Sequence, residues 1–295
     1  MHKFLTTIAF SATVLAWQPL IAAKAPEVYL PSTPWNIDYA DDSCALRRKF
    51  DTADRTVTLE MRQFAPGDGF EVTLASKTVT MRDWETKVRF IPDVKPRKIE
   101  HPLLLNYPGG ISAVRWSDSL FGYDEPGDNI ANKPPPTLDE AAYKMREASI
   151  RGLEISGALG KPIVLQFGEM HAAMVGMRTC IDELVTHWGI DAIAQKTLTR
   201  RAQAVDQGVW ARVLQANYPS ALLQAGKSGR VGVRMIVGAD GKPTSCHIQS
   251  VIQDVIFGQT ACNGMMKAAR FEPALDSAGK PIASYYLTRV IYSIN

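Results

Sequence analysis

Hydrophobic and polar residues alternate along the first third of the chain. The alternation has a two-residue period in three runs, at residues 57–62, 70–74 and 84–90. This period is typical of β-strands that bury one face. Residues 92–136 carry many prolines and glycines and no clear period. We therefore predict a mostly-β region that is followed by irregular chain.

Helical spacing replaces this alternation after residue 136. Thr137 and Glu140 have the spacing of a capping box, which predicts the start of a helix. The short apolar run at 161–168 predicts one more strand. Residues 169–188 carry an apolar stripe at helical spacing, and Gly189 stands where a left-handed C-terminal cap is expected.

The last ninety residues or so have the pattern of a second unit. Two apolar-alternating strands, at 231–237 and 246–250, flank a turn at Asp240-Gly241. A helix over 254–269, a loop over 271–281 and a long final strand over 283–294 follow. We predict an antiparallel three-stranded sheet covered by one helix. The even-numbered face of the final strand is expected to meet this helix, because Arg289 on the other face would be costly to bury.

These patterns divide the chain into an N-terminal domain, residues 24–195, and a C-terminal domain, residues 207–295. The polar, helical-looking stretch 196–206 is the predicted linker between them. The overall fold class is α+β: a mostly-β domain with helices, followed by a small sheet-and-helix domain.

The N-terminus has the order of a secretory signal peptide, residues 1–23. Lys3 precedes an apolar run, Pro19 breaks it, and cleavage is expected after Ala23. The alternative is an uncleaved anchor in the inner membrane, facing the periplasm, although several hydroxyl side chains make residues 4–23 a poor span. Cleavage predicts a periplasmic protein. The net charge of +3 is too small to indicate a nucleic-acid partner.

Export changes how the four cysteines are interpreted. An even number in an oxidising compartment favours disulfides. Four cysteines allow three pairings, and proximity favours Cys246 with Cys262, which leaves Cys44 with Cys180. The alternative is four buried free thiols.

The sequence contains no G-x-S-x-G, H-E-x-x-H, phosphate-loop or dinucleotide-binding motif, and we predict neither catalytic residues nor a cofactor. Met170, His171, Met174 and Met177 offer ligands that would suit Cu(I). The methionines also have the spacing of one apolar helix face, so we predict that they belong to the core and that no metal binds.

Three segments of the C-terminal region resemble the C-terminal domain of the TonB family. These segments read QANYPSAL, GRVGVRMIVGADGKP and ARFEPALDSAGKPI, and the closing strand follows them. The family often has a Gln-Pro-x-Tyr-Pro run before its first strand. Gln215, Tyr218 and Pro219 match that run, whereas Ala216 replaces its first proline. The resemblance covers about residues 207–295.

The resemblance implies a non-catalytic module for protein interaction in the periplasm. Domains of this family bind outer-membrane receptors, and a short receptor segment adds as a strand to the sheet edge. The partner here would be such a receptor or a peptide strand. The predicted partner-binding residues are Gln215, Tyr218, Pro219, Tyr285, Leu287, Arg289 and Ile291. For Tyr218 and Pro219 the alternative role is to turn the chain before the strand.

Two other functions remain open. The first is an anchored energy transducer for TonB-dependent transport across the outer membrane. Such a protein needs a retained anchor and a long proline-rich spacer, whereas this chain has only a short Lys133–Pro136 connector and a folded-looking domain. The second is an enzymatic or metal-binding site in residues 24–195, in which we recognise no characterised family.

Overall fold

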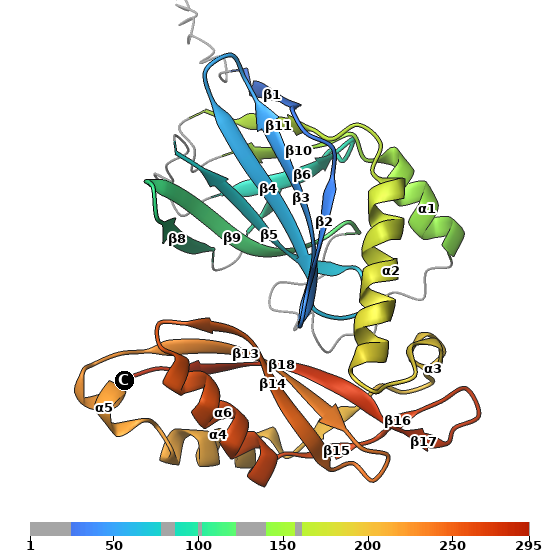
Figure 1. Ribbon diagram of the computed structural model, residues 1–295, viewed down its shortest axis with the longest axis vertical. Coiled ribbons are helices and arrows are strands. Elements are labelled where there is room, and N and C mark those ends of the chain that lie inside the picture. Colours follow the sequence, from blue (N-terminus) through green and yellow to red (C-terminus); the bar gives the residue numbers. More distant parts are fainter. Residues whose placement is uncertain (1–24, 78–85, 100–101, 122–139, 157–160, 295) are drawn as a thin grey trace, which may run out of the picture.

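The computed structural model describes residues 25–77, 86–99, 102–121, 140–156 and 161–294, which form an α+β protein of two packed units (Figure 1). The predicted signal peptide lies outside the described residues, and so does Thr137 of the predicted capping box. The helix that this box was expected to open is present from Glu140 onward.

In the described residues, the N-terminal unit is built on one sheet of eleven strands. Its order is β7-β6-β10-β11-β1-β3-β4-β5-β9-β8, and β2 also pairs with β3. Strand β1 joins the two halves, because it runs parallel to β11 and antiparallel to β3. The bounds of the strands are β1 (Glu27–Pro31), β2 (Asn36–Ala40), β3 (Ser43–Asp51), β4 (Thr56–Gln63), β5 (Gly69–Ser76), β6 (Lys87–Ile91), β7 (Arg97–Lys98), β8 (Leu103–Tyr107), β9 (Ile111–Ser119), β10 (Gly152–Ser156) and β11 (Ile163–Gln166).

The alternating runs form β4, β5 and β6, as the sequence predicts, although residues 84–85 of the third run lie outside the described residues. Val57, Leu59 and Met61 are buried on one face of β4. Strands β7, β8 and β9 lie in the stretch for which no period was found. The buried Asp118 interrupts the alternation of β9, and β8 is an edge strand with mainly exposed side chains. Neither strand therefore presents a two-residue hydrophobic period.

Three helices complete the N-terminal unit: α1 (Glu140–Ser149), α2 (His171–His187) and α3 (Ala192–Lys196). Helix α2 packs along β2 and β3 (Figure 1). Its predicted stripe is buried in the core, which includes Met170, Met174 and Met177. Gly189 has φ +77° just after the helix, as expected of a left-handed cap.

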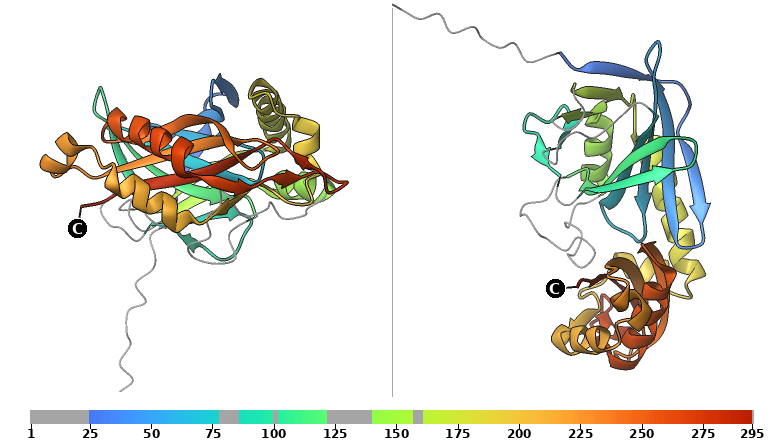
Figure 2. Two further views of the ribbon diagram at one scale, coloured as in Figure 1. Left: turned by 90° about the horizontal axis from the view of Figure 1, so that it is seen from below. Right: turned by 90° about the vertical axis from the view of Figure 1, so that its left-hand side faces the viewer.

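The C-terminal unit has the predicted three-stranded antiparallel sheet, in the order β14-β13-β18. Helix α6 packs on β13 and β14, and α4 packs on α6. The two helices lie on the side of the sheet away from the N-terminal unit (Figure 1), and they face the viewer when the molecule is seen from below (Figure 2, left). The elements of this unit are β12 (Gln203–Val205), α4 (Gln207–Ala216), α5 (Ser220–Gln224), β13 (Gly229–Val237), β14 (Pro243–Ile252), α6 (Val255–Ala268), β15 (Arg270–Glu272), β16 (Ala274–Leu275), β17 (Pro281–Ile282) and β18 (Ser284–Tyr292).

The even-numbered face of β18 meets the helix, as predicted. Tyr286, Val290 and Tyr292 share a core with Phe257 of α6, and the rings of Phe257 and Tyr292 are stacked with centroids 4.8 Å apart. The odd-numbered face is turned toward the N-terminal unit. Tyr285 of that face belongs to the N-terminal core. The sheet is thus enclosed between its own helices and the N-terminal unit.

Part of the predicted linker belongs to the C-terminal unit and is not helical. Strand β12 pairs with β15, and Arg200 forms a β-bridge with Leu275. The expectation of a loop over 271–281 is also wrong in part, because β15, β16 and the start of β17 lie there. The pairing of β12 with β15 and the bridge between Arg200 and Leu275 join segments about seventy residues apart, which no local pattern reveals.

Candidate functional site

The outer edge of β18 is the clearest feature with potential to bind another protein. Among the described residues, β18 pairs with β13 on one side and with no strand on the other. In an antiparallel edge strand, alternate residues direct their N–H and C=O groups away from the sheet. An extended peptide that supplied matching groups would continue the sheet at this edge.

The predicted partner-binding residues of β18 fall into two pairs. Tyr285 is 8% exposed, and Leu287 is half-buried against the N-terminal core. Arg289 and Ile291 are exposed, the latter at 61%. The N-terminal unit therefore covers the first half of this face and leaves the second half open.

The Tyr-Pro turn lies near the other end of β18. Tyr218 packs edge-on against Tyr292, with ring centroids 5.3 Å apart, and against Phe257. Its hydroxyl donates to the Lys227 carbonyl oxygen over 2.6 Å. Pro219 is the N-cap of α5, and Gln215 is exposed on α4. Tyr218 thus has a structural role, and it lies at the opposite end of β18 from Tyr285.

Both predicted disulfides are present. Cys44 of β3 is bonded to Cys180 of α2, with Cα atoms 6.1 Å apart, so the bond fixes the long helix to the N-terminal sheet. Cys246 of β14 is bonded to Cys262 of α6, with Cα atoms 5.5 Å apart. Each unit has its own covalent link between sheet and helix, and none of the four cysteines is free.

Arg234 anchors the interface between the two units. This residue of β13 is 1% exposed, and its Nη2 atom lies 2.8 Å from Oδ1 of Asp42 in the turn between β2 and β3. Its guanidinium also lies over the Trp188 ring, 3.8 Å from the centroid. Burial lowers the pKa of Arg234, and the Asp42 carboxylate acts in the opposite direction. Separation of the two units would leave this buried cation without its carboxylate partner, which is costly.

Polar contacts extend this interface across the sheet. Ser284 donates from Oγ to the Gln195 side-chain oxygen over 2.6 Å, and Gln195 donates to the Ala283 carbonyl over 3.1 Å. On β14, Gln249 donates to the Phe64 carbonyl over 3.4 Å. Sequence reasoning did not identify this interface. A signal for it was present, because Arg234 and Ile236 are large side chains on the strand face that the helix does not cover.

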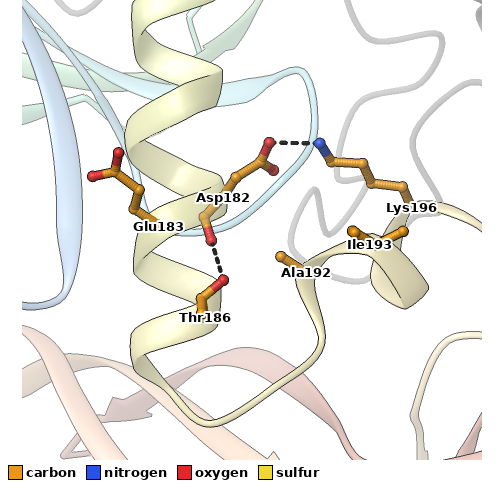
Figure 3. Close-up of a pocket in the computed structure, with 6 residues that line it drawn as sticks. All are labelled: Asp182, Glu183, Thr186, Ala192, Ile193 and Lys196. Atoms are coloured by element: carbon orange, nitrogen blue, oxygen red, sulfur yellow. Dashed lines mark hydrogen bonds and ion pairs between the residues drawn. The ribbon is translucent and has the colours of Figure 1, made fainter.

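Helices α2 and α3 enclose a surface pocket of about 380 Å³. Figure 3 shows that Asp182 and Lys196 face one another across it and form an ion pair. Ile193 at its rim is 78% exposed. The lining residues are Asp182, Glu183, Thr186, Ala192, Ile193 and Lys196. They include no nucleophile paired with a base, so this hollow offers no evident chemistry.

The methionine-rich helix is part of the core. Met170, Met174 and Met177 are at most 5% exposed and pack with the N-terminal cluster. The His171 imidazole contacts α1, with Nδ1 2.8 Å from the buried Glu147 carboxylate. Among the described residues, no cluster of three histidine, cysteine or acidic side chains is arranged to hold a metal ion.

In this described part of the chain, no helix is both long enough and apolar enough to cross a bilayer. The predicted signal or anchor, residues 4–23, lies outside the described residues.

Comparison with known proteins agrees with the fold of the C-terminal unit. Residues 215–294 match the family described as Gram-negative bacterial TonB protein C-terminal. The match begins within α4 and extends past β18, and the N-terminal unit lies outside it. No curated protein matches the chain. Domains of this family are non-catalytic interaction modules, and together with the two disulfides they indicate a location in the cell envelope. The C-terminal unit is therefore a TonB family C-terminal domain with a role in protein interaction.

Proposed function

We propose that this protein is a non-catalytic periplasmic adaptor that binds an extended segment of an outer-membrane receptor, or a similar peptide, at the outer edge of β18. The observation that carries the proposal is the position of β18: it is an edge strand in a domain of the TonB family. Main-chain hydrogen bonds to this edge supply the affinity, and side chains at alternate positions supply selectivity.

The predicted partner-binding side chains have three different roles in this proposal. Arg289 and Ile291 lie on the exposed half of the strand and contact the partner directly. Tyr285 and Leu287 are covered by the N-terminal unit, so they contribute through the backbone edge. Tyr218 packs against Tyr292 near the end of the strand. Together with Pro219, which caps α5, and Gln215 of α4, it shapes the exit of the partner segment.

Titration of ten-residue receptor-derived peptides into the oxidised full-length protein tests the proposal. The best binder is then synthesised in two forms, N-methylated at odd or at even positions. Strand addition uses the N–H groups of one parity only, so one form loses affinity by about tenfold or more and the other binds normally. Amide signals of residues 284–292 shift on binding. Equal binding of both forms, or no binding across the panel, contradicts the proposal.

Residues 4–23 decide between this adaptor and an anchored energy transducer. Cleavage after Ala23 releases a protein that starts at Lys24 into the periplasm. Mass spectrometry of the protein from fractionated envelopes measures this directly. An intact Met1 in the inner-membrane fraction would instead favour the transducer.

A further inference from the structure

The N-terminal unit reaches the open half of β18 through β5. Arg289 lies two residues beyond Leu287, where the cover of the N-terminal core ends, and its side chain is 48% exposed. Its Nη2 atom lies 3.7 Å from Oε1 of Glu71 on β5. A strand that adds beside Arg289 therefore has a second wall, which the other domain provides.

The side chains named here, where this wall meets the C-terminal sheet, carry more positive than negative charge. The Glu71 carboxylate is shared, because Arg115 of β9 also lies 3.8 Å from it. Arg115 is held in place by Thr73, whose hydroxyl oxygen accepts from Nε over 3.0 Å. Arg230 of β13 is on the same sheet face as Arg289, next to Ile291. Three guanidinium groups thus gather around one carboxylate.

Glu71 makes no close contact with the two guanidinium groups that it pairs with, Arg115 and Arg289. Oε2 of Glu71 is buried and has no hydrogen-bond partner among the described residues, and both of its ion pairs are longer than hydrogen bonds. The pKa of Arg230 is lowered by burial and by repulsion from Arg289, while Glu71 acts in the opposite direction. A second carboxylate placed here would satisfy guanidinium donors that Glu71 leaves without close contact.

We propose that the partner segment carries an acidic side chain that lies between Arg289 and Arg115, so that both domains of this protein contact the peptide and contribute to its selection. The inference rests on the proposed function and defines its partner more closely, as an extended peptide with a carboxylate facing the N-terminal unit. Successive side chains of a strand point to opposite faces, so the acidic residue is effective at positions of one parity only.

Charge substitutions on both molecules test this inference. The tightest receptor-derived decapeptide is prepared with a single Glu, or a single Gln, at each position in turn. Against the full-length protein, Glu exceeds Gln in affinity by about fivefold at one position or at two positions of equal parity. Arg115→Gln and Arg289→Gln each remove most of this preference, so that the Glu and Gln peptides bind each variant about equally well.

Glu71→Gln gives the opposite result, because it removes the competing carboxylate. The Glu peptide binds this variant more tightly than it binds the parent protein, an outcome that mere loss of structure would not produce. Arg55→Gln is the matched control. Arg55 forms a similar half-buried ion pair with Glu27, 3.0 Å apart. Arg55 follows the C-terminal end of β3, whereas Asp42 precedes its N-terminal end. The Arg55→Gln variant keeps the preference for the Glu peptide.

The outcomes separate this inference from the function on which it rests. If the peptides bind and Glu equals Gln at every position, the acidic partner is wrong while strand addition stands. A preference for Glu that survives Arg115→Gln shows that the N-terminal unit does not read the peptide. If no peptide in the panel binds, both proposals fail.

Discussion

The guanidinium of Arg234 is held between the Trp188 ring and the Asp42 carboxylate, and each of these comes from the other domain. Trp188 in turn meets the ring of Tyr285 edge-on, with centroids 5.5 Å apart. One buried residue of the C-terminal sheet thus fixes a helix end and a strand turn of the N-terminal unit. The docking of the two domains should depend on this contact more than on the polar contacts around it.

Asp42→Ala should lower the free energy of unfolding of the full-length protein by about 2 kcal/mol, because it leaves a buried guanidinium without its carboxylate. The effect stays below that of a fully buried pair because the Asp42 side chain is 34% exposed. Urea denaturation measures it. Asp41→Ala, in the same turn but exposed, is the control and should change stability little. Equal midpoints for the two variants would show that the contact does not hold the domains together.

The C-terminal core should lose stability in alkaline solution through Tyr292. Burial raises the pKa of its phenol from 10.0 to about 12, and Tyr218 adds to the shift. The folded protein favours the protonated form, so this contribution is complete below pH 10 and is lost as the pH rises through about 12. The Tyr292 hydroxyl has no hydrogen-bond partner among the described residues. Tyr292→Phe should therefore fold normally and show a weaker fall in thermal stability over this range.

Removal of the Cys246–Cys262 bond should destabilise the C-terminal unit by about 3 kcal/mol on a chain-entropy estimate for a loop of this length. The double variant Cys246→Ala/Cys262→Ala, compared with the parent by urea unfolding, gives the value. Near-UV circular dichroism reports on the tyrosine-rich core of the same unit. Replacing Cys44 and Cys180 together provides a comparison, because it leaves the C-terminal staple intact. An unchanged midpoint for the first double variant would show that the loop is already ordered without the bond.

A fragment that starts at Leu198 should be more stable than one that starts at Gln207. The longer fragment keeps β12 paired with β15 and the bridge between Arg200 and Leu275. Thermal unfolding of the two oxidised fragments compares them directly. If both melt at the same temperature, the pairing of β12 contributes nothing to the domain, and the boundary at residue 207 is adequate.

Local pattern was sufficient for the elements that bury one continuous face. Strand β4, helix α2 and the strand-strand-helix-strand order of the C-terminal unit each carry several apolar residues at one period, and so each is evident in the sequence. The predicted export and the short sequence distance between Cys246 and Cys262 were sufficient to predict the disulfides, because four cysteines allow only three pairings. The short strands β12, β15, β16 and β17 have two or three residues each, too few to show a period.

Of the candidate site, the sequence predicted only the strand β18 and its edge, and not the side chains of the N-terminal unit that lie against it. The alternation of β18 assigns its two faces correctly, and family resemblance points to its edge. That the N-terminal unit covers Tyr285 and Leu287 depends on where the Asp42 turn and the end of α2 lie in space. Glu71 and Arg115 approach β18 for the same reason. Residues more than a hundred positions apart are in contact at β18, and the pattern of a single sequence does not reveal such long-range contacts.

The position of β1 would limit the reach of an anchored form of this protein. Among the described residues, the first strand begins at Glu27, four positions after Ala23. A chain of four residues spans at most about 14 Å. If residues 4–23 stayed in the inner membrane, the N-terminal sheet would lie against the bilayer, and the TonB-like domain would extend from it only by the length of the folded body. Contact with an outer-membrane receptor would then require the two membranes to approach closely, whereas a released protein can diffuse to it.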